Sequence, residues 1–116
     1  METLTSNTVT HEASAGTAEL ARFFPEVQRV QIRAVLKPQQ TEKSASRETV
    51  TVEFVSPTHA IFVSALPLEF DDLVRLQPAE GKGRTEGRVI AVQYHLGRKA
   101  VAVQFVNAET SWVNRP

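Results

Sequence analysis

The sequence predicts a small all-β protein, a six-stranded antiparallel barrel with a short N-terminal helix. Apolar and polar residues alternate over several short stretches, which is the period of a half-buried strand. Turn-forming residues separate these stretches, and helical spacing occurs only near the two ends of the 116-residue chain. This combination favours a small closed or half-closed antiparallel barrel.

The composition is that of one ordinary globular domain. Hydrophobic residues make up 41% of the chain and charged residues 22%. The absence of cysteine excludes disulfides, thiolate zinc sites and cysteine nucleophiles. The formal net charge is zero, so we expect no general attraction to nucleic acid. No apolar run approaches the ~20 residues that cross a bilayer, and the N-terminus lacks a secretion signal. We therefore expect a cytoplasmic protein without membrane insertion.

The clearest element is a hairpin over residues 49–63. Val50, Val52 and Phe54 alternate with polar neighbours and are expected on one strand face. Ser56 and Pro57 then form a turn, because proline presets the φ of a turn's second residue and serine can bond the backbone two residues on. A short apolar run over residues 60–63 is the second strand.

The N-terminal region is expected to be a mobile tail followed by a short helix. Residues 1–16 have no hydrophobic period. Residues 17–24 form a helix in which Thr17 is the cap, and the side chains of Leu20, Phe23 and Phe24 share one face. Two helical turns are marginal alone, so these aromatic side chains should dock on the barrel.

The other expected strands are 27–36, 73–76, 85–96 and 99–106. An exposed loop spans residues 37–47, and Gly97-Arg98 is a hairpin turn in which glycine supplies a positive φ. Residues 107–110 are expected to open a last short helix that tucks Trp112 against the barrel mouth. We divide the chain into a tail with its helix (1–24), a barrel (25–113) and a C-terminal end (114–116).

The order of these parts resembles the PilZ domain, the bacterial barrel that binds the second messenger cyclic di-GMP. The resemblance covers roughly residues 25–113 and includes the stretches DLVRL (72–76), GRVIAV (87–92) and AVQF (102–105). Two signatures bind the ligand in that family. One is Arg-x-x-x-Arg in the segment that leads into the first strand, and the other is Asp/Asn-x-Ser-x-x-Gly at the turn after the second strand.

Several residues match these signatures, and two depart from them. Arg29 and Arg33 have the Arg-x-x-x-Arg spacing, and Arg22 is an upstream alternative in another register. The second signature keeps Ser56, but Phe54 stands at the acidic or amide position and His59 at the glycine position. Arginine matches phosphate and the guanine edge and can stack on a base, whereas Phe54 offers no hydrogen bond.

Each of these residues also has a structural explanation. Arg29 and Arg33, about 13 Å apart at ~3.3 Å per residue, are equally consistent with the solvated face of an exposed strand. Ser56 is a natural turn cap, and His59 is expected to be an exposed turn residue that could otherwise stack on guanine. The histidines at 11, 59 and 95 lack metal-ligand spacing.

The resemblance implies a cyclic di-GMP receptor or adaptor in bacterial signalling. Its ligand residues would be Arg29, Arg33, Ser56, Arg22 and His59, and a protein is expected as the downstream partner. No catalytic residues, metal or cofactor are expected, so the chain is not expected to be an enzyme. The alternative is a degenerate PilZ-like protein-interaction domain that binds no nucleotide. A nucleic-acid-binding barrel is a third option that zero net charge disfavours.

Overall fold

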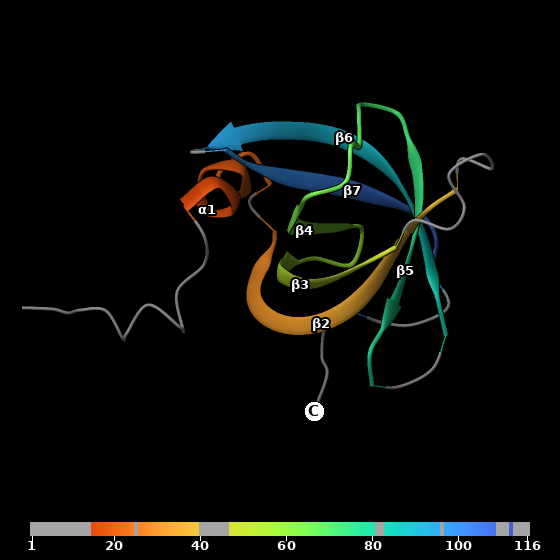
Figure 1. The fold of residues 1–116 in the computed structure, drawn as a ribbon. Helices are drawn as coiled ribbons and strands as arrows, with labels where there is room; N and C mark the ends of the chain where they lie inside the picture. The colour runs from red at the N-terminus through yellow and green to blue at the C-terminus, as the bar shows by residue number, and fades with distance from the viewer. Residues whose placement is uncertain are drawn as a thin grey trace, which may run out of the picture.

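A computed structural model describes residues 15–24, 26–39, 47–80, 83–95, 97–108 and 112. Within these residues the chain forms one helix and six strands, and the strands close into an antiparallel barrel (Figure 1). The expected fold class is therefore confirmed. No helix in this described part of the chain is both long enough and apolar enough to span a membrane.

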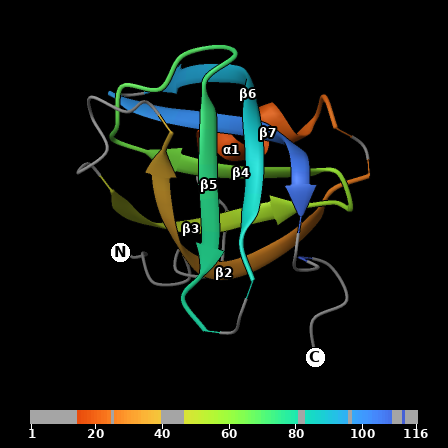
Figure 2. The same ribbon diagram turned by 90° about the vertical axis from the view of Figure 1, so that its right-hand side faces the viewer.

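The barrel closes in an order that differs from the order of the strands along the chain. The elements are α1 (Ala15–Ala21), β2 (Gln28–Pro38), β3 (Glu48–Val55), β4 (His59–Ser64), β5 (Leu73–Pro78), β6 (Thr85–His95) and β7 (Arg98–Ala108). Around the barrel the order is β2-β3-β4-β7-β6-β5, and β5 pairs with β2 to complete the circle. Figure 2 shows β5 crossing the side of the barrel that lies opposite α1.

Both hairpins that the sequence indicates are present. β3 pairs antiparallel with β4 across the turn at Pro57. β6 pairs with β7 up to His95 and Arg98, and Gly97 has a φ of 80°. Only glycine adopts this left-handed conformation without steric cost, which explains the tight turn at this position.

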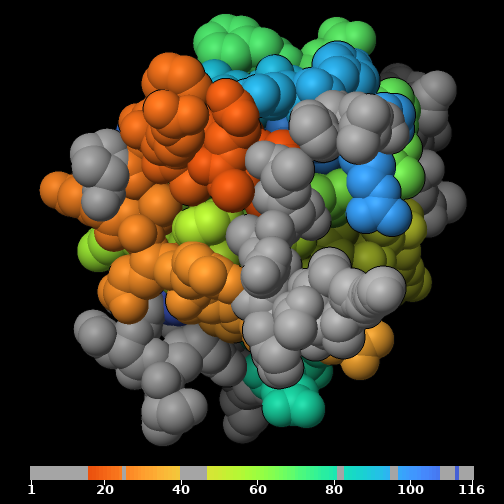
Figure 3. Space-filling model, turned by 90° about the vertical axis from the view of Figure 1, so that its left-hand side faces the viewer, coloured from red at the N-terminus to blue at the C-terminus, as the bar shows by residue number. Residues whose placement is uncertain are grey.

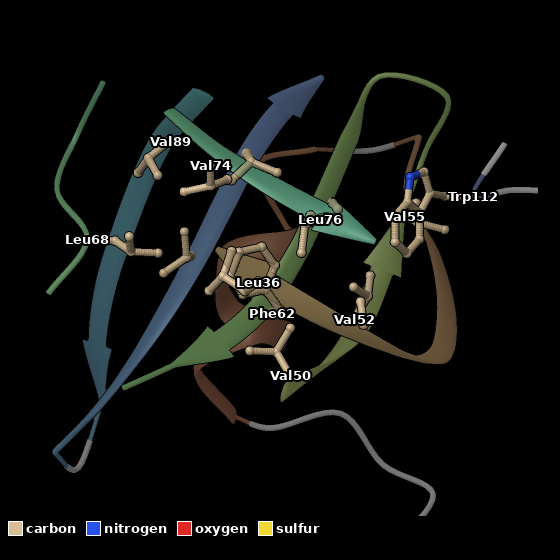
Figure 4. Close-up of a cluster of buried hydrophobic side chains, with 14 residues drawn as sticks. Leu36, Val50, Val52, Val55, Phe62, Leu68, Val74, Leu76, Val89 and Trp112 are labelled. Atoms are coloured by element: carbon tan, nitrogen blue, oxygen red, sulfur yellow. The ribbon is translucent and has the colours of Figure 1, made fainter. Parts of the chain in front are cut away.

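The barrel interior is filled by apolar side chains from every strand. Val52, Phe62, Val74 and Val89 are fully buried, and Figure 4 shows them converging on the barrel axis. Trp112 joins this core with an exposed fraction of 2%. Its Nε1–H donates to Thr85 Oγ1 at 2.7 Å, so the indole satisfies its only donor while it fills the barrel.

A second apolar cluster lies outside the barrel, beneath α1. We call it the outer cluster; its buried members are Leu20, Phe54, Ile61, Ala100 and Ala102. The helix contributes Leu20, and the alanines of β7 leave room for the helix to approach the strand. Because a seven-residue helix is not stable alone in water, burial of this cluster is what holds α1 in place.

A β-bulge in β3 turns Phe54 toward this outer cluster. Val52 pairs with Phe62, but Phe54 pairs with Ile61, so Glu53 is an extra residue in the strand. The bulge breaks the alternation of side chains. Val52 and Val55 face the barrel interior, whereas Phe54 lies under α1. The expectation that Val52 and Phe54 share a face is therefore wrong.

A second bulge in β6 has the same effect on the other side of α1. Val89 pairs with Val103 and Ala91 pairs with Ala102, which leaves Ile90 as the extra residue. Ile90 and Ala91 consequently both pack against the outer cluster. Two bulges thus widen the apolar surface on which the helix lies.

The helix differs from the expected one in position and in contacts. It spans Ala15–Ala21 rather than residues 17–24, so the expected tail loses its last two residues and residues 1–14 lie outside the described part. Thr17 lies inside the helix rather than at its cap position, is fully buried, and donates its Oγ1–H to Glu53 Oε1 at 2.6 Å. Phe23 is 73% exposed, so of the two expected aromatic anchors only Phe24 docks.

Several strand boundaries also move. β2 includes Lys37 and Pro38, which were expected in a loop, and β5 extends to Pro78. β7 includes Asn107 and Ala108, so a helix does not begin at Asn107. Residues 40–46, 81–82 and 109–110, for which a loop, a turn and the rest of that helix were expected, lie outside the described residues.

Candidate functional site

The turn between β3 and β4 is built around the hydroxyl of Ser56. Its Oγ accepts hydrogen bonds from the backbone N–H groups of Thr58 at 3.1 Å and His59 at 3.0 Å. The Ser56 N–H donates to the carbonyl of His59 at 2.8 Å. The serine is 1% exposed. Its oxygen is therefore committed to the turn, which confirms the structural explanation for this residue.

The turn also forms a hydrogen bond with β7 and a ring contact with the segment after α1. The Phe105 N–H donates to the carbonyl of Thr58 at 2.8 Å. The ring of His59 lies 5.0 Å from the ring of Phe24 in a tilted arrangement, and its Nδ1 is 2.7 Å from Thr58 Oγ1. His59 is half-buried rather than exposed, so the expectation of an exposed turn histidine is wrong.

The surroundings of His59 favour its neutral form. Burial lowers the pKa of the imidazole below its usual value, and the negative charge of Glu26 opposes this effect in part. A neutral ring packs against Phe24 without the cost of burying a charge.

Phe54 is the residue that the resemblance sets at an acidic or amide position. It is 8% exposed and contacts the outer cluster. Figure 3 shows α1 and the segment that follows it, coloured red to orange, lying over this side of the barrel. The outer wall of the barrel at Phe54 is thus covered by the chain itself.

Arg29 lies next to this region. It pairs directly with Phe54 across β2 and β3, and Gln28 pairs with Val55, the residue before Ser56. Directly opposed residues in an antiparallel pair project to the same side of the sheet. Arg29 is exposed, so its side chain lies at the margin of the covered wall.

The other two arginines are placed differently. Arg33 pairs with Thr51, three residues before Phe54 along β3, and is exposed. Arg22 follows α1, and its Nη1 lies 3.9 Å from Glu19 Oε2 in an exposed pair. Such a pair contributes little to stability. The structure therefore brings Arg29, Ser56 and His59 together at one end of the β2–β3 pair, and places Arg33 farther along β2.

Two features of this region were not found in the sequence. One is the packing of His59 on Phe24, and the other is the pair of bulges that sends Phe54 and Ile90 outward. The spacing of Leu20 and Phe24 indicated that an aromatic side chain would dock on the barrel. This spacing did not indicate which strand the aromatic side chain would contact. Among the described residues, no histidine, aspartate and glutamate side chains group as metal ligands would.

No protein-family model matches the sequence, and no curated protein is significantly similar to it.

Proposed function

We propose that this chain is a PilZ-like barrel that acts as a non-catalytic protein-interaction module and takes up no nucleotide at the position where the PilZ family binds cyclic di-GMP. The order of parts along the chain and the six-stranded barrel support the PilZ resemblance. The observation that carries the loss of nucleotide binding is the burial of Phe54 beneath α1.

Three contacts oppose nucleotide binding at this place. Phe54 provides no hydrogen bond to a guanine edge, and α1 covers it. The Ser56 oxygen is already occupied by two backbone donors. His59 packs on Phe24 where a glycine would leave space for a base. A guanine would have to displace the helix and expose the outer cluster, which costs the free energy of its burial.

Cyclic di-GMP binding remains a second candidate, and one observation favours it. Arg29 is exposed at the same end of the barrel as the Ser56 turn, with Arg33 four residues along the strand. A guanidinium in this position could engage a phosphate. In that case Arg29 and Arg33 would bind the phosphates or guanines, Ser56 could still donate its hydroxyl hydrogen to a guanine edge, and Arg22 or His59 would add a contact.

Isothermal titration calorimetry of the full chain with cyclic di-GMP separates the two candidates. GTP and cyclic di-AMP serve as ligand controls, and Arg29→Ala and Arg98→Ala as matched variants, because Arg98 lies at the tip of the β6–β7 hairpin. Our proposal predicts no saturable heat. Saturable micromolar binding that Arg29→Ala abolishes and Arg98→Ala preserves would establish the second candidate in its place.

A further inference from the structure

A group of cations lies on the barrel wall away from α1. Lys37 in β2 pairs directly with Arg75 in β5. Their neighbours Leu36, Val74 and Leu76 are fully buried in the core, and side chains alternate along a strand. Lys37 and Arg75 therefore both project outward. Figure 2 shows β5 on the side of the barrel that faces the viewer.

Two further cations border this pair. Leu36 pairs with Glu48, so Arg47 comes next to Lys37 on the β3 side. Arg33 lies on the outer face of β2, four residues before Lys37, with Val35 between them on the same face. We call Arg33, Lys37, Arg47 and Arg75 the basic face.

No carboxylate neutralises the basic face within the described residues. None of its four side chains takes part in an ion pair or hydrogen bond there, and Arg75 Nε is buried without an acceptor. The carboxylate of Glu48 is engaged elsewhere, because it accepts from Ser64 Oγ at 2.7 Å and from the Ala65 N–H at 2.9 Å. Glu86 pairs in register with Arg75 from β6, yet forms no ion pair with it.

Lys37 and Arg75 form a like-charge pair across β2 and β5. Like charges directly opposite each other on neighbouring strands repel, and a single acidic residue at position 37 or 75 would remove the repulsion. The basic face therefore has the character of a surface that meets negative charge.

We infer that the basic face is a docking surface for an acidic, Asp/Glu-rich segment of a partner protein. This inference rests on the proposed protein-interaction function and gives the partner's chemistry. Charge complementarity selects the occupant: arginine and lysine heads at the rim of an interface attract carboxylates, speed encounter and fix orientation. The outer wall of a barrel is convex, whereas small-molecule sites are concave. Zero net charge of the whole chain disfavours a nucleic acid, whose binding depends on the neutralisation of many phosphates.

The position of the basic face leaves α1 undisturbed. α1 lies over β3, β4, β6 and β7, while three residues of the basic face are on β2 and β5 and Arg47 immediately precedes β3. Figures 1 and 2 show α1 and β5 on opposite sides of the barrel. A partner can therefore bind here without displacing the outer cluster.

The test is fluorescence anisotropy of a labelled eight-residue glutamate peptide titrated with the full chain. The ionic strength is about 0.02 M, so that salt screens the exposed charges little. An eight-residue glutamine peptide is the uncharged control. Lys37→Glu is compared with Arg98→Glu, which makes the same charge change at the hairpin tip. We expect the native chain to bind the glutamate peptide, Lys37→Glu to weaken binding about fivefold or more, and Arg98→Glu to weaken it less than about twofold. The thermal midpoint of Lys37→Glu should not fall below that of the native chain.

Three results would overturn the inference. The first is that the native chain does not bind the glutamate peptide. The second is that Arg98→Glu weakens binding as much as Lys37→Glu. The third is that single-stranded DNA or phosphatidylserine vesicles bind at the basic face and the peptide fails to compete with them. Calorimetric binding of cyclic di-GMP that depends on Arg29 would instead contradict the proposed function, so the two failures are distinguishable.

Discussion

The role assigned to Phe54 predicts what happens when its ring is removed. In Phe54→Ala the outer cluster loses its largest side chain, and α1 loses the surface on which Leu20 packs. The barrel interior is untouched, because Phe54 projects away from it. We therefore expect a stability loss accompanied by release of α1 while the barrel itself remains folded.

The size of the loss follows from the burial of the ring. Truncation of a buried phenylalanine to alanine typically costs about 3–5 kcal/mol. Phe54 is 8% exposed, but its cluster lies under a short helix that can move, so we expect the lower value, about 3 kcal/mol. At about 4 °C or more per kcal/mol for a domain near 100 residues, the thermal midpoint should fall by roughly 12 °C or more.

Two probes measure this prediction. Trp112 fluorescence in a denaturant titration follows the barrel, because the indole is in its core. Amide hydrogen exchange at residues 22–24 follows α1, because these amides donate to the carbonyls of its last turn. Phe23→Ala is the matched control, since its ring is 73% exposed and its loss should change stability by less than about 0.5 kcal/mol. A loss below about 1 kcal/mol in Phe54→Ala, with exchange in α1 unchanged, would refute the reasoning.

Three further predictions concern single residues. Ser56→Ala should lower the unfolding free energy by about 1–2 kcal/mol because two backbone donors lose their acceptor; a denaturant titration showing no loss would contradict the capping role. Since burial holds the pKa of His59 below 6.5 in the folded state, the unfolded chain binds more protons. Stability should therefore decrease as the pH falls below about 6.5, and His59→Asn should reduce that dependence; an identical pH profile of the thermal midpoint would argue against it. Lys37→Glu should raise the unfolding free energy by about 0.2–1 kcal/mol, because it turns a repulsive pair with Arg75 into an attractive one; a lower midpoint by calorimetry would count against the like-charge pair.

The strands could be predicted because their signals are local. Alternation in β2, where Ala34 and Leu36 face the core, is visible in the sequence itself. The turns at Pro57 and Gly97 follow from the backbone preferences of those residues. The predicted ends of the strands were less accurate. Lys37 and Asn107 are polar, and they belong to their strands because they pair with β5 and β6.

The site depends on contacts that no local pattern encodes. At Glu53 and at Ile90, one strand has an extra residue between two paired positions that are adjacent on its partner strand. Such a bulge is visible only once the pairing of the strands is known. Without the register, Phe54 reads as an ordinary inward residue. Likewise, Lys37 and Arg75 are far apart in the sequence, and only the closure of β5 onto β2 places them opposite each other.

The most direct test of the central claim is a pair of ¹⁵N–¹H correlation spectra of the full chain, without and with excess cyclic di-GMP. We propose that α1 and Phe54 cover the outer wall at which a PilZ-like ligand would otherwise bind. We predict that the amides of Arg29, Ser56 and His59 keep their chemical shifts. Saturable shifts confined to these amides, together with changes in α1, would contradict the account and assign the chain as a cyclic di-GMP receptor.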